Sequence, residues 1–371
     1  MLHAPDIQTP RIPINPPVYY APKAIGSLVL DGNLEKDFWK DVPFTSPFVD
    51  ISGPDFPTPR FLTRAKICWD EENLYIGARL DGDEIWANIT KRDSVMYYDN
   101  DFEVFIDPSS STHNYMELEM NALNTQWDLM LTHPYRDGGR SVTGWDMKGL
   151  QTAVFVSGEI NNPSADNRFW SVEIKIPFSS LMETYSREEN PPDLERCYPC
   201  RQAPKTGEFW RMNFSRVQWT VEKKSAYKKV TDENGKWRPE DNWVWAPTGL
   251  IDIHCPEFWG YVFFTENGEN FPIPQDEKRK LDLRLIYYAQ YVYRRRTGSF
   301  TSDLRALDCP LLPYPVTCEA TSRTFLLSCD SEEKGCRVYL RDDGYTFTEV
   351  LQHHEEGKSM TTRKPEMEIM Q

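Results

Sequence analysis

The chain has 371 residues, a formal net charge of −15 and a pI near 5.0, so it lacks the basic surface that nucleic-acid binding requires. Aromatic residues make up 13% of it, which supplies rings both for a core and for contacts with a ligand. No apolar run approaches the roughly 20 residues that span a bilayer, and the proline-broken start shows no secretory signal. We therefore expect a soluble protein without membrane insertion.

Residues 1–22 are rich in proline, and we expect an arm without regular structure there. From residue 23 onward, short runs of β-forming residues are separated by turn residues. Two such runs flank the acidic turn at 70–73, which is typical of a hairpin. Similar runs continue to residue 266 with few long helical patterns. The pattern predicts a mainly β domain at 23–266, an antiparallel two-sheet β-sandwich of jelly-roll or immunoglobulin-like type.

Two neighbouring runs, 101–107 and 115–121, alternate apolar and polar side chains. The alternation places one set of side chains in the core, namely Phe102, Val104, Ile106, Met116, Leu118 and Met120. If the two strands pair, the opposite face carries Glu103, Phe105, Tyr115, Glu117, Glu119 and Asn121. This mixture of rings and hydrogen-bonding groups suits an uncharged, polyhydroxylated ligand better than an apolar one.

The pattern changes after an acidic, proline-containing linker at 267–280. Apolar residues then recur at helical spacing from Leu281 to Val292, and two strand-like runs follow. We predict a small α+β unit at 281–350. The remaining stretch, 351–371, lacks periodicity and is expected to be a disordered tail.

Sequence motifs do not indicate an enzyme. The common hydrolase, metalloprotease and nucleotide-binding motifs are absent from the sequence. A glycosidase would need two carboxylates across one cleft, and Glu103, Glu117 and Glu119 offer such a pair, but alternating glutamates are more typical of a solvated sheet face. We expect no catalytic residues.

The eight cysteines give no metal or redox site by their spacing. Cys197 and Cys200 form a C-x-x-C without the further ligands of a zinc site, so a structural role or a local disulfide is expected there. The C-terminal cysteines would pair only in an exported protein; they are Cys309, Cys318, Cys329 and Cys336.

Several blocks, in order along the chain, resemble the family 9 carbohydrate-binding modules, which belong to the DOMON-like sandwiches. The stretch from DSVMYYDNDFEVFID to MELEMNALN is similar to the family's central strands. The other similar blocks are VLDGNLEKDFW, AKICWDEENLYIGARL, WSVEIKIPFSSL, FWRMNFSRV and FWGYVFF. The resemblance spans about 23–266 and implies a calcium-containing sandwich that holds sugar rings between two tryptophans.

The family's sugar-binding residues agree with this sequence at some positions and differ from it at others. Glu103 matches the glutamate that binds sugar hydroxyls, and Asn213 matches approximately the amide on a later strand. The first stacking tryptophan falls at Tyr97, with Tyr98 beside it. The family's arginine falls near Glu119, which reverses a charge.

The second stacking tryptophan falls near Ile253 and His254, where this chain has no large ring. Four other tryptophans are candidates to replace it, each with a core or turn role as the alternative: Trp86, Trp127, Trp145 and Trp243.

The resemblance implies non-catalytic carbohydrate binding. The expected contacts are Tyr97, Tyr98, Glu103, Asn121, Trp127 and Asn213. Any calcium is expected at acidic loop residues, with Asp99 and Asp101 as candidate ligands. A glycoside hydrolase partner and an extracellular or periplasmic location fit the family. Two alternatives stay open: a structural or interaction sandwich with a degenerate sugar site, and a DOMON-like domain that holds haem between a methionine and a histidine, although core packing is the favoured role of the methionines.

Overall fold

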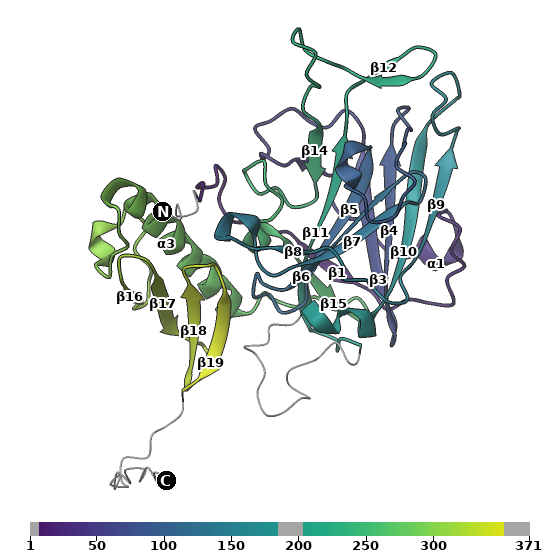
Figure 1. Ribbon diagram of the computed structural model, residues 1–371. Helices are drawn as coiled ribbons and strands as arrows, with labels where there is room; N and C mark the ends of the chain where they lie inside the picture. The colour runs from purple at the N-terminus through teal and green to yellow at the C-terminus, as the bar shows by residue number, and fades with distance from the viewer. Residues whose placement is uncertain (1–6, 185–202, 352–371) are drawn as a thin grey trace, which may run out of the picture.

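A computed structural model describes residues 7–184 and 203–351 and contains two parts (Figure 1). The larger part is a β-sandwich, and the smaller part combines a long helix with a four-stranded sheet. The predicted mainly β fold with a small C-terminal α+β unit is confirmed. The tail expected at 351–371, apart from its first residue, and the pair Cys197 and Cys200 lie outside the described residues.

The larger sheet of the sandwich has nine strands, in the order β1, β15, β11, β5, β6, β7, β8, with β14 also paired with β11 and β2 paired with β14. The pairing of β1 with β15 is parallel, and the others are antiparallel. The strands are β1 (Val18–Ala21), β2 (Val49–Asp50), β5 (Asp101–Asp107), β6 (Tyr115–Asn121), β7 (Gln126–Leu131), β8 (Ser141–Val142), β11 (Phe209–Gln218), β14 (Asp241–Val244) and β15 (Gly260–Phe264).

The smaller sheet has four antiparallel strands, in the order β3, β4, β10, β9. The hairpin predicted around the acidic turn is confirmed, and the Asp70 carboxylate accepts the backbone N–H groups of Glu72 and Asn73. The elements are β3 (Thr63–Trp69), β4 (Asn73–Asp81), β9 (Gln151–Ser157) and β10 (Phe169–Pro177), with a separate hairpin of β12 (Val221–Lys223) and β13 (Tyr227–Lys229) and a short helix α1 (Asp37–Lys40).

The two sheets enclose an apolar core. Phe102 and Val104 of β5 and Met116 and Met120 of β6 are fully buried in it, as the alternation predicts. Core packing is therefore the role of both methionines. Each large apolar side chain buried in this way contributes about 1.5–3 kcal/mol to the free energy of folding.

The C-terminal unit has its own core, in which helix α3 packs on one face of a four-stranded antiparallel sheet. The helix begins within the stretch 267–280 that we expected to be a linker. Asp276 and Glu277 in its first turn favour this start, since acidic side chains stabilise a helix N-terminus. No described helix is long and apolar enough to cross a membrane. The elements are α3 (Gln275–Thr297), β16 (Thr317–Ala320), β17 (Phe325–Asp330), β18 (Cys336–Arg341) and β19 (Thr346–Val350).

The N-terminal arm is more ordered than its prolines suggest. Its last residues form β1, which obtains backbone partners by pairing with β15. Earlier in the arm, Ile7 and Ile14 pack against the core of the C-terminal unit, and the Arg11 N–H bonds the Gly249 carbonyl of the sandwich. The expectation of an arm without regular structure was therefore wrong, because pairing and burial outweigh the local effect of proline.

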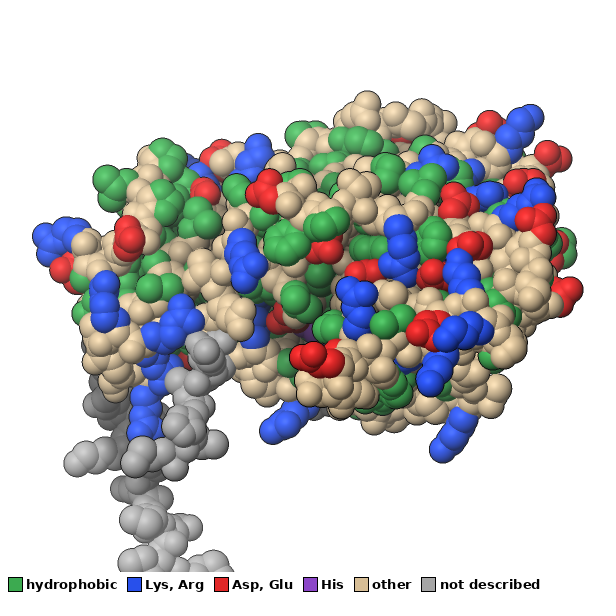
Figure 2. Space-filling model, turned by 90° about the horizontal axis from the view of Figure 1, so that it is seen from above, with side chains coloured by type: hydrophobic (Ala, Val, Ile, Leu, Met, Phe, Trp, Pro, Cys, Tyr) green, Lys and Arg blue, Asp and Glu red, His purple; other side chains and the backbone are tan. Residues whose placement is uncertain are grey.

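All six described cysteines are free thiols. The disulfides considered for the C-terminal cysteines do not form, since the register of β17 and β18 places Cys329 opposite Val338 instead of Cys336. On the surface seen from above, basic and acidic side chains are intermixed with apolar ones (Figure 2).

Candidate functional site

A cavity of about 390 Å³ opens on the outer face of the larger sheet. Its residues come from β5, β6, β7, β11 and β14 and from the loops around them. The lining residues are Ile51, Tyr97, Glu103, Glu117, Glu119, Trp127, Leu129, Tyr135, Val217, Glu240, Asn242, Ile251, Asp252, Ile253 and His254.

Strand register builds the acidic floor of this cavity. β5 pairs with β6, which is the condition on which the expected polar face depended, so that Glu103 lies directly opposite Glu119. Glu117 comes two residues before Glu119 on the same face. β7 continues the floor by placing Trp127 opposite Glu119. On the other side of β5, β11 places Ser215 opposite Glu103. The alternation of each strand directs these side chains outward, away from the core.

Four carboxylates on this face of the sheet are buried: Glu103, Glu117 and Glu119 of the cavity floor, and Asp101 beside them on β5. Burial raises the pKa of Glu103 to about 7. Burial and the neighbouring Glu103 raise the pKa of Glu117 to about 8. Burial and the surrounding carboxylates also raise the pKa of Asp101 and that of Glu119 well above their usual values.

These carboxylates have few partners. Glu119 accepts the backbone N–H of Met96 at 3.2 Å, and Oδ1 of Asp101 accepts that of Val217 at 3.3 Å. The other oxygen of Asp101, Oδ2, is buried and has no hydrogen-bond partner. Within the described ranges, no lysine or arginine forms an ion pair with any of the four. Burial lowers the pKa of His254 on the cavity wall to about 4, so its imidazole is neutral at pH 7 and adds no positive charge.

Three aromatic side chains surround the floor. Tyr97 stands in a 3₁₀ turn and is 40% exposed, and Trp127 is half-buried on β7. Tyr135, from the loop after β7, is 46% exposed and packs edge-on against His254 with ring centroids 4.7 Å apart. The cavity thus combines aromatic surfaces with carboxylate oxygens, an arrangement that can pack against an apolar ring face while bonding polar groups at its edge.

Comparison with known proteins agrees with the sequence resemblance. Residues 30–190 match the family described as carbohydrate family 9 binding domain-like. Over these residues the chain is similar to a family 9 carbohydrate-binding domain. No curated protein matches the chain at a significant level.

Three solved structures are similar to it. A family 9 carbohydrate-binding module from Caldicellulosiruptor kristjanssonii in complex with cellotriose is 16% identical, with 69% of this chain and 98% of that chain covered and a TM-score of 0.41. The same module in complex with glucose is 15% identical, with 69% and 100% covered and a TM-score of 0.41. A putative carbohydrate-binding protein from Bacteroides uniformis is 14% identical, with 67% and 100% covered and a TM-score of 0.46.

The sandwich brings three of the predicted contacts together in the cavity, namely Tyr97, Glu103 and Trp127. Tyr98, although adjacent to Tyr97 in the chain, lines a different pocket beside Lys229 and Trp237. The two rings are nevertheless in contact, with centroids 4.9 Å apart.

The two predicted amides do not line the cavity, which corrects their assignment as sugar contacts. The Asn213 side chain donates to the Ala246 carbonyl at 2.9 Å and accepts the Ala246 N–H at 2.9 Å. The Asn121 side chain donates to the Ile89 carbonyl at 2.8 Å and to Asp99 at 3.0 Å. Both amides hold loops in place and are buried.

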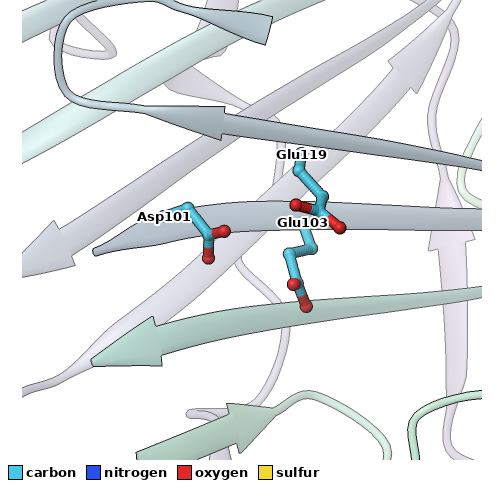
Figure 3. A group of neighbouring side chains, drawn as sticks. All are labelled: Asp101, Glu103 and Glu119. Atoms are coloured by element: carbon cyan, nitrogen blue, oxygen red, sulfur yellow. The ribbon is translucent and has the colours of Figure 1, made fainter. Parts of the chain in front are cut away.

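The two predicted calcium ligands, Asp99 and Asp101, differ in how well they fit a metal ion. Oδ2 of Asp99 accepts the N–H groups of Asn88 and Ile89 as well as the Asn121 amide, so Asp99 does not fit a metal. Asp101 fits better. One oxygen from each of Asp101, Glu103 and Glu119 lies within 4.8 Å of the others (Figure 3), and calcium takes oxygen ligands of this kind.

The expected position of the second tryptophan does lie on the cavity wall, at Ile253 and His254. Trp145 and Trp243 belong to the sandwich core, and Trp86 lines the neighbouring pocket, so none of these replaces it. The sequence interpretation missed four other polar or aromatic lining residues. Tyr135, Glu240 and Asp252 come from segments between strands, where no alternation shows which way a side chain points, and Asn242 comes from the short strand β14.

Proposed function

We propose that the outer-face cavity binds a carbohydrate without transforming it. The observation that carries the proposal is the meeting of three rings, Tyr97, Trp127 and Tyr135, around a polar floor in one cavity. Sugars present C–H faces that pack on aromatic side chains, and their hydroxyls need fixed polar partners. The cavity volume of about 390 Å³ is in the range of small-ligand sites.

The polar groups of the cavity are mainly acceptors. Glu103, Glu117 and Asp252 offer carboxylate oxygens, and Asn242 adds an amide that donates as well. Hydroxyl groups are donors that match such oxygens. Glu103 also occupies the position at which the family resemblance expects a hydroxyl-binding glutamate, which supports its role as a contact.

The placement of the carboxylates favours binding over hydrolysis. A glycosidase needs two carboxyl groups that flank the scissile bond from different sides. Here Glu103 and Glu119 lie opposite each other on adjacent strands and form one floor under the ligand. A role beside a glycoside hydrolase partner, outside the cytoplasm, fits a non-catalytic binding domain of this kind.

Calorimetry with the purified chain tests the proposal. Cellotriose and glucose are suitable first probes, followed by a panel of other oligosaccharides. Tyr97→Ala and Trp127→Ala should each weaken binding by about 1–3 kcal/mol through loss of stacking. Phe56→Ala is the matched control, because Phe56 is about as exposed as Tyr97, 41% against 40%, and does not line the cavity, and it should change affinity by no more than about 0.5 kcal/mol.

Binding that is equal in all four proteins would place the site elsewhere. Absence of binding to every sugar by the wild type would instead favour the alternative role, a sandwich that acts through contacts with another protein. Release of reducing sugar during the titration would refute the non-catalytic role.

A further inference from the structure

The acidic floor lacks a counter-charge. Four buried carboxylates lie on one sheet face, and no lysine or arginine among the described residues forms an ion pair with them. A carboxylate removed from water is unfavourable unless it is paired, protonated or bound to a metal. Neighbouring carboxylates add mutual repulsion. The arrangement therefore requires either bound protons or a bound cation.

The geometry favours a cation. Asp101 and Glu103 lie on β5 and Glu119 on the adjacent β6, and one oxygen from each lies within 4.8 Å of the other two (Figure 3). A second, independent observation is that Oδ2 of Asp101 is fully buried without a hydrogen-bond partner. This oxygen is buried, has no hydrogen-bond partner and lies in a group of three carboxylates. Such an environment is typical of a metal ligand before the ion binds.

We propose that Asp101, Glu103 and Glu119 form a divalent-cation site, and that the cation in turn binds hydroxyls of the sugar. The ligand set contains only carboxylate oxygens, which suits calcium, whose six to eight oxygen ligands tolerate irregular geometry. Three side chains cannot complete this number, so further positions remain open. The cation site does not depend on the proposed function, whereas its contact with sugar does.

Two of the three proposed ligands, Glu103 and Glu119, line the cavity, whereas Asp101 is fully buried and does not line it. A cation held by all three would therefore be within reach of a sugar in the cavity. Two adjacent sugar hydroxyls can occupy its open coordination positions.

Metal binding is tested first, without sugar. The full-length chain is freed of metal with EDTA, and terbium luminescence excited through the cavity aromatics, among them Trp127, is followed during titration. We expect one terbium ion per chain, displaced by calcium, and a rise in melting temperature with calcium. Asp101→Asn and Glu119→Gln should each weaken calcium binding at least tenfold. Glu319→Gln, which changes an exposed carboxylate of the C-terminal unit, should leave it unchanged.

Circular dichroism of each variant checks that it is folded, and the two ligand variants provide independent tests. A folded wild type that binds neither terbium, calcium, magnesium nor manganese would overturn the cation site. Equal calcium affinity in both ligand variants and the wild type would overturn the assignment of its ligands.

Sugar affinity is then measured with calcium and with EDTA. At least a tenfold loss in EDTA supports the bridging contact. Calcium binding together with calcium-independent sugar binding would overturn the bridge but leave both the cation site and the proposed function standing. Calcium binding without affinity for any sugar would overturn the bridge and the proposed function, while the cation site would stand.

Discussion

Asn213 shows how one residue can match a binding motif and yet have another role. Its side chain forms two hydrogen bonds with the backbone of Ala246, which lies 33 residues later in the chain. The amide is fully buried, and so cannot reach a ligand in the cavity. Its position opposite Phe105 on β5 is on the outer side of the sheet, but the loop at Ala246 covers it.

Asn213→Ala is expected to destabilise the fold by about 2–4 kcal/mol, because it leaves the Ala246 N–H and carbonyl groups without partners in a buried place. Urea denaturation measures this loss. Asn242→Ala, which changes an asparagine of the cavity lining, should have the opposite profile, with weaker sugar binding and little loss of stability. A sugar-binding defect in folded Asn213→Ala with unchanged stability would contradict this assignment.

At the scale of elements, the D-G turn before α1 docks the N-terminal loop onto the smaller sheet. The buried carboxylate of Glu173 on β10 accepts the N–H groups of Asp31 and Gly32 at 2.9 and 2.8 Å. It also accepts the indole N–H of Trp39 at 2.7 Å. The Glu173 carboxylate thereby joins a turn, a helix and a strand, which gives the D-G turn of the sequence pattern a structural role.

Gly32→Ala is expected to be strongly destabilising, by about 3 kcal/mol or more. Gly32 has a φ of +81°, and an added Cβ would clash with the backbone of Val154 and Phe155. Gly26→Ala is the matched control, because Gly26 has nearly the same φ of +80° and open space around it, so about 1 kcal/mol is expected. Chemical denaturation compares the two, and equal losses would mean that backbone conformation alone matters at Gly32.

At the scale of the whole molecule, the C-terminal unit supports one wall of the cavity. Tyr135 is followed by Arg136, which bonds both carboxylate oxygens of Glu257 at 2.8 Å and the Tyr288 hydroxyl of α3 at 3.1 Å. The next residue, Asp137, bonds the Tyr287 hydroxyl of the same helix. Docking of α3 therefore holds the loop that presents Tyr135 to the cavity.

The same interface is expected to be sensitive to acid. Burial opposes ionisation of Glu257, but Arg136 and Arg284 outweigh it and lower its pKa to about 2, against about 4.3 in an unfolded chain. Its stabilising contribution of about 3 kcal/mol is full above about pH 5 and is lost as the pH falls toward 2. Burial raises the pKa of the nearby Asp137 to about 6, which acts in the opposite direction between about pH 6 and 4.

Melting temperatures between pH 6 and 2.5 test this prediction. The wild type should lose stability steeply below about pH 4, and Glu257→Gln should be less stable at pH 6 but lose less on acidification. The exposed Glu319→Gln should follow the wild type. Parallel curves for the wild type and Glu257→Gln would show that another group controls the acid transition.

The sequence alone determined the class of fold and the composition of the sheet face. Alternation in 101–107 and 115–121 is a local property of strands, so it predicted correctly that Glu103, Glu117 and Glu119 would share a face opposite the core. The family resemblance added the positions of Tyr97 and of the wall at Ile253 and His254.

Tertiary structure alone decided which of those polar groups are free to bind. Asp99, Asn121 and Asn213 are occupied by backbone groups of distant loops, and Tyr135 reaches the cavity from a loop held by α3. The physical reason is that the face of the sheet to which a side chain points follows from alternation along the strand, which neighbouring residues reveal. Hydrogen-bond partners and burial depend instead on contacts between segments far apart in the chain, which local patterns do not encode.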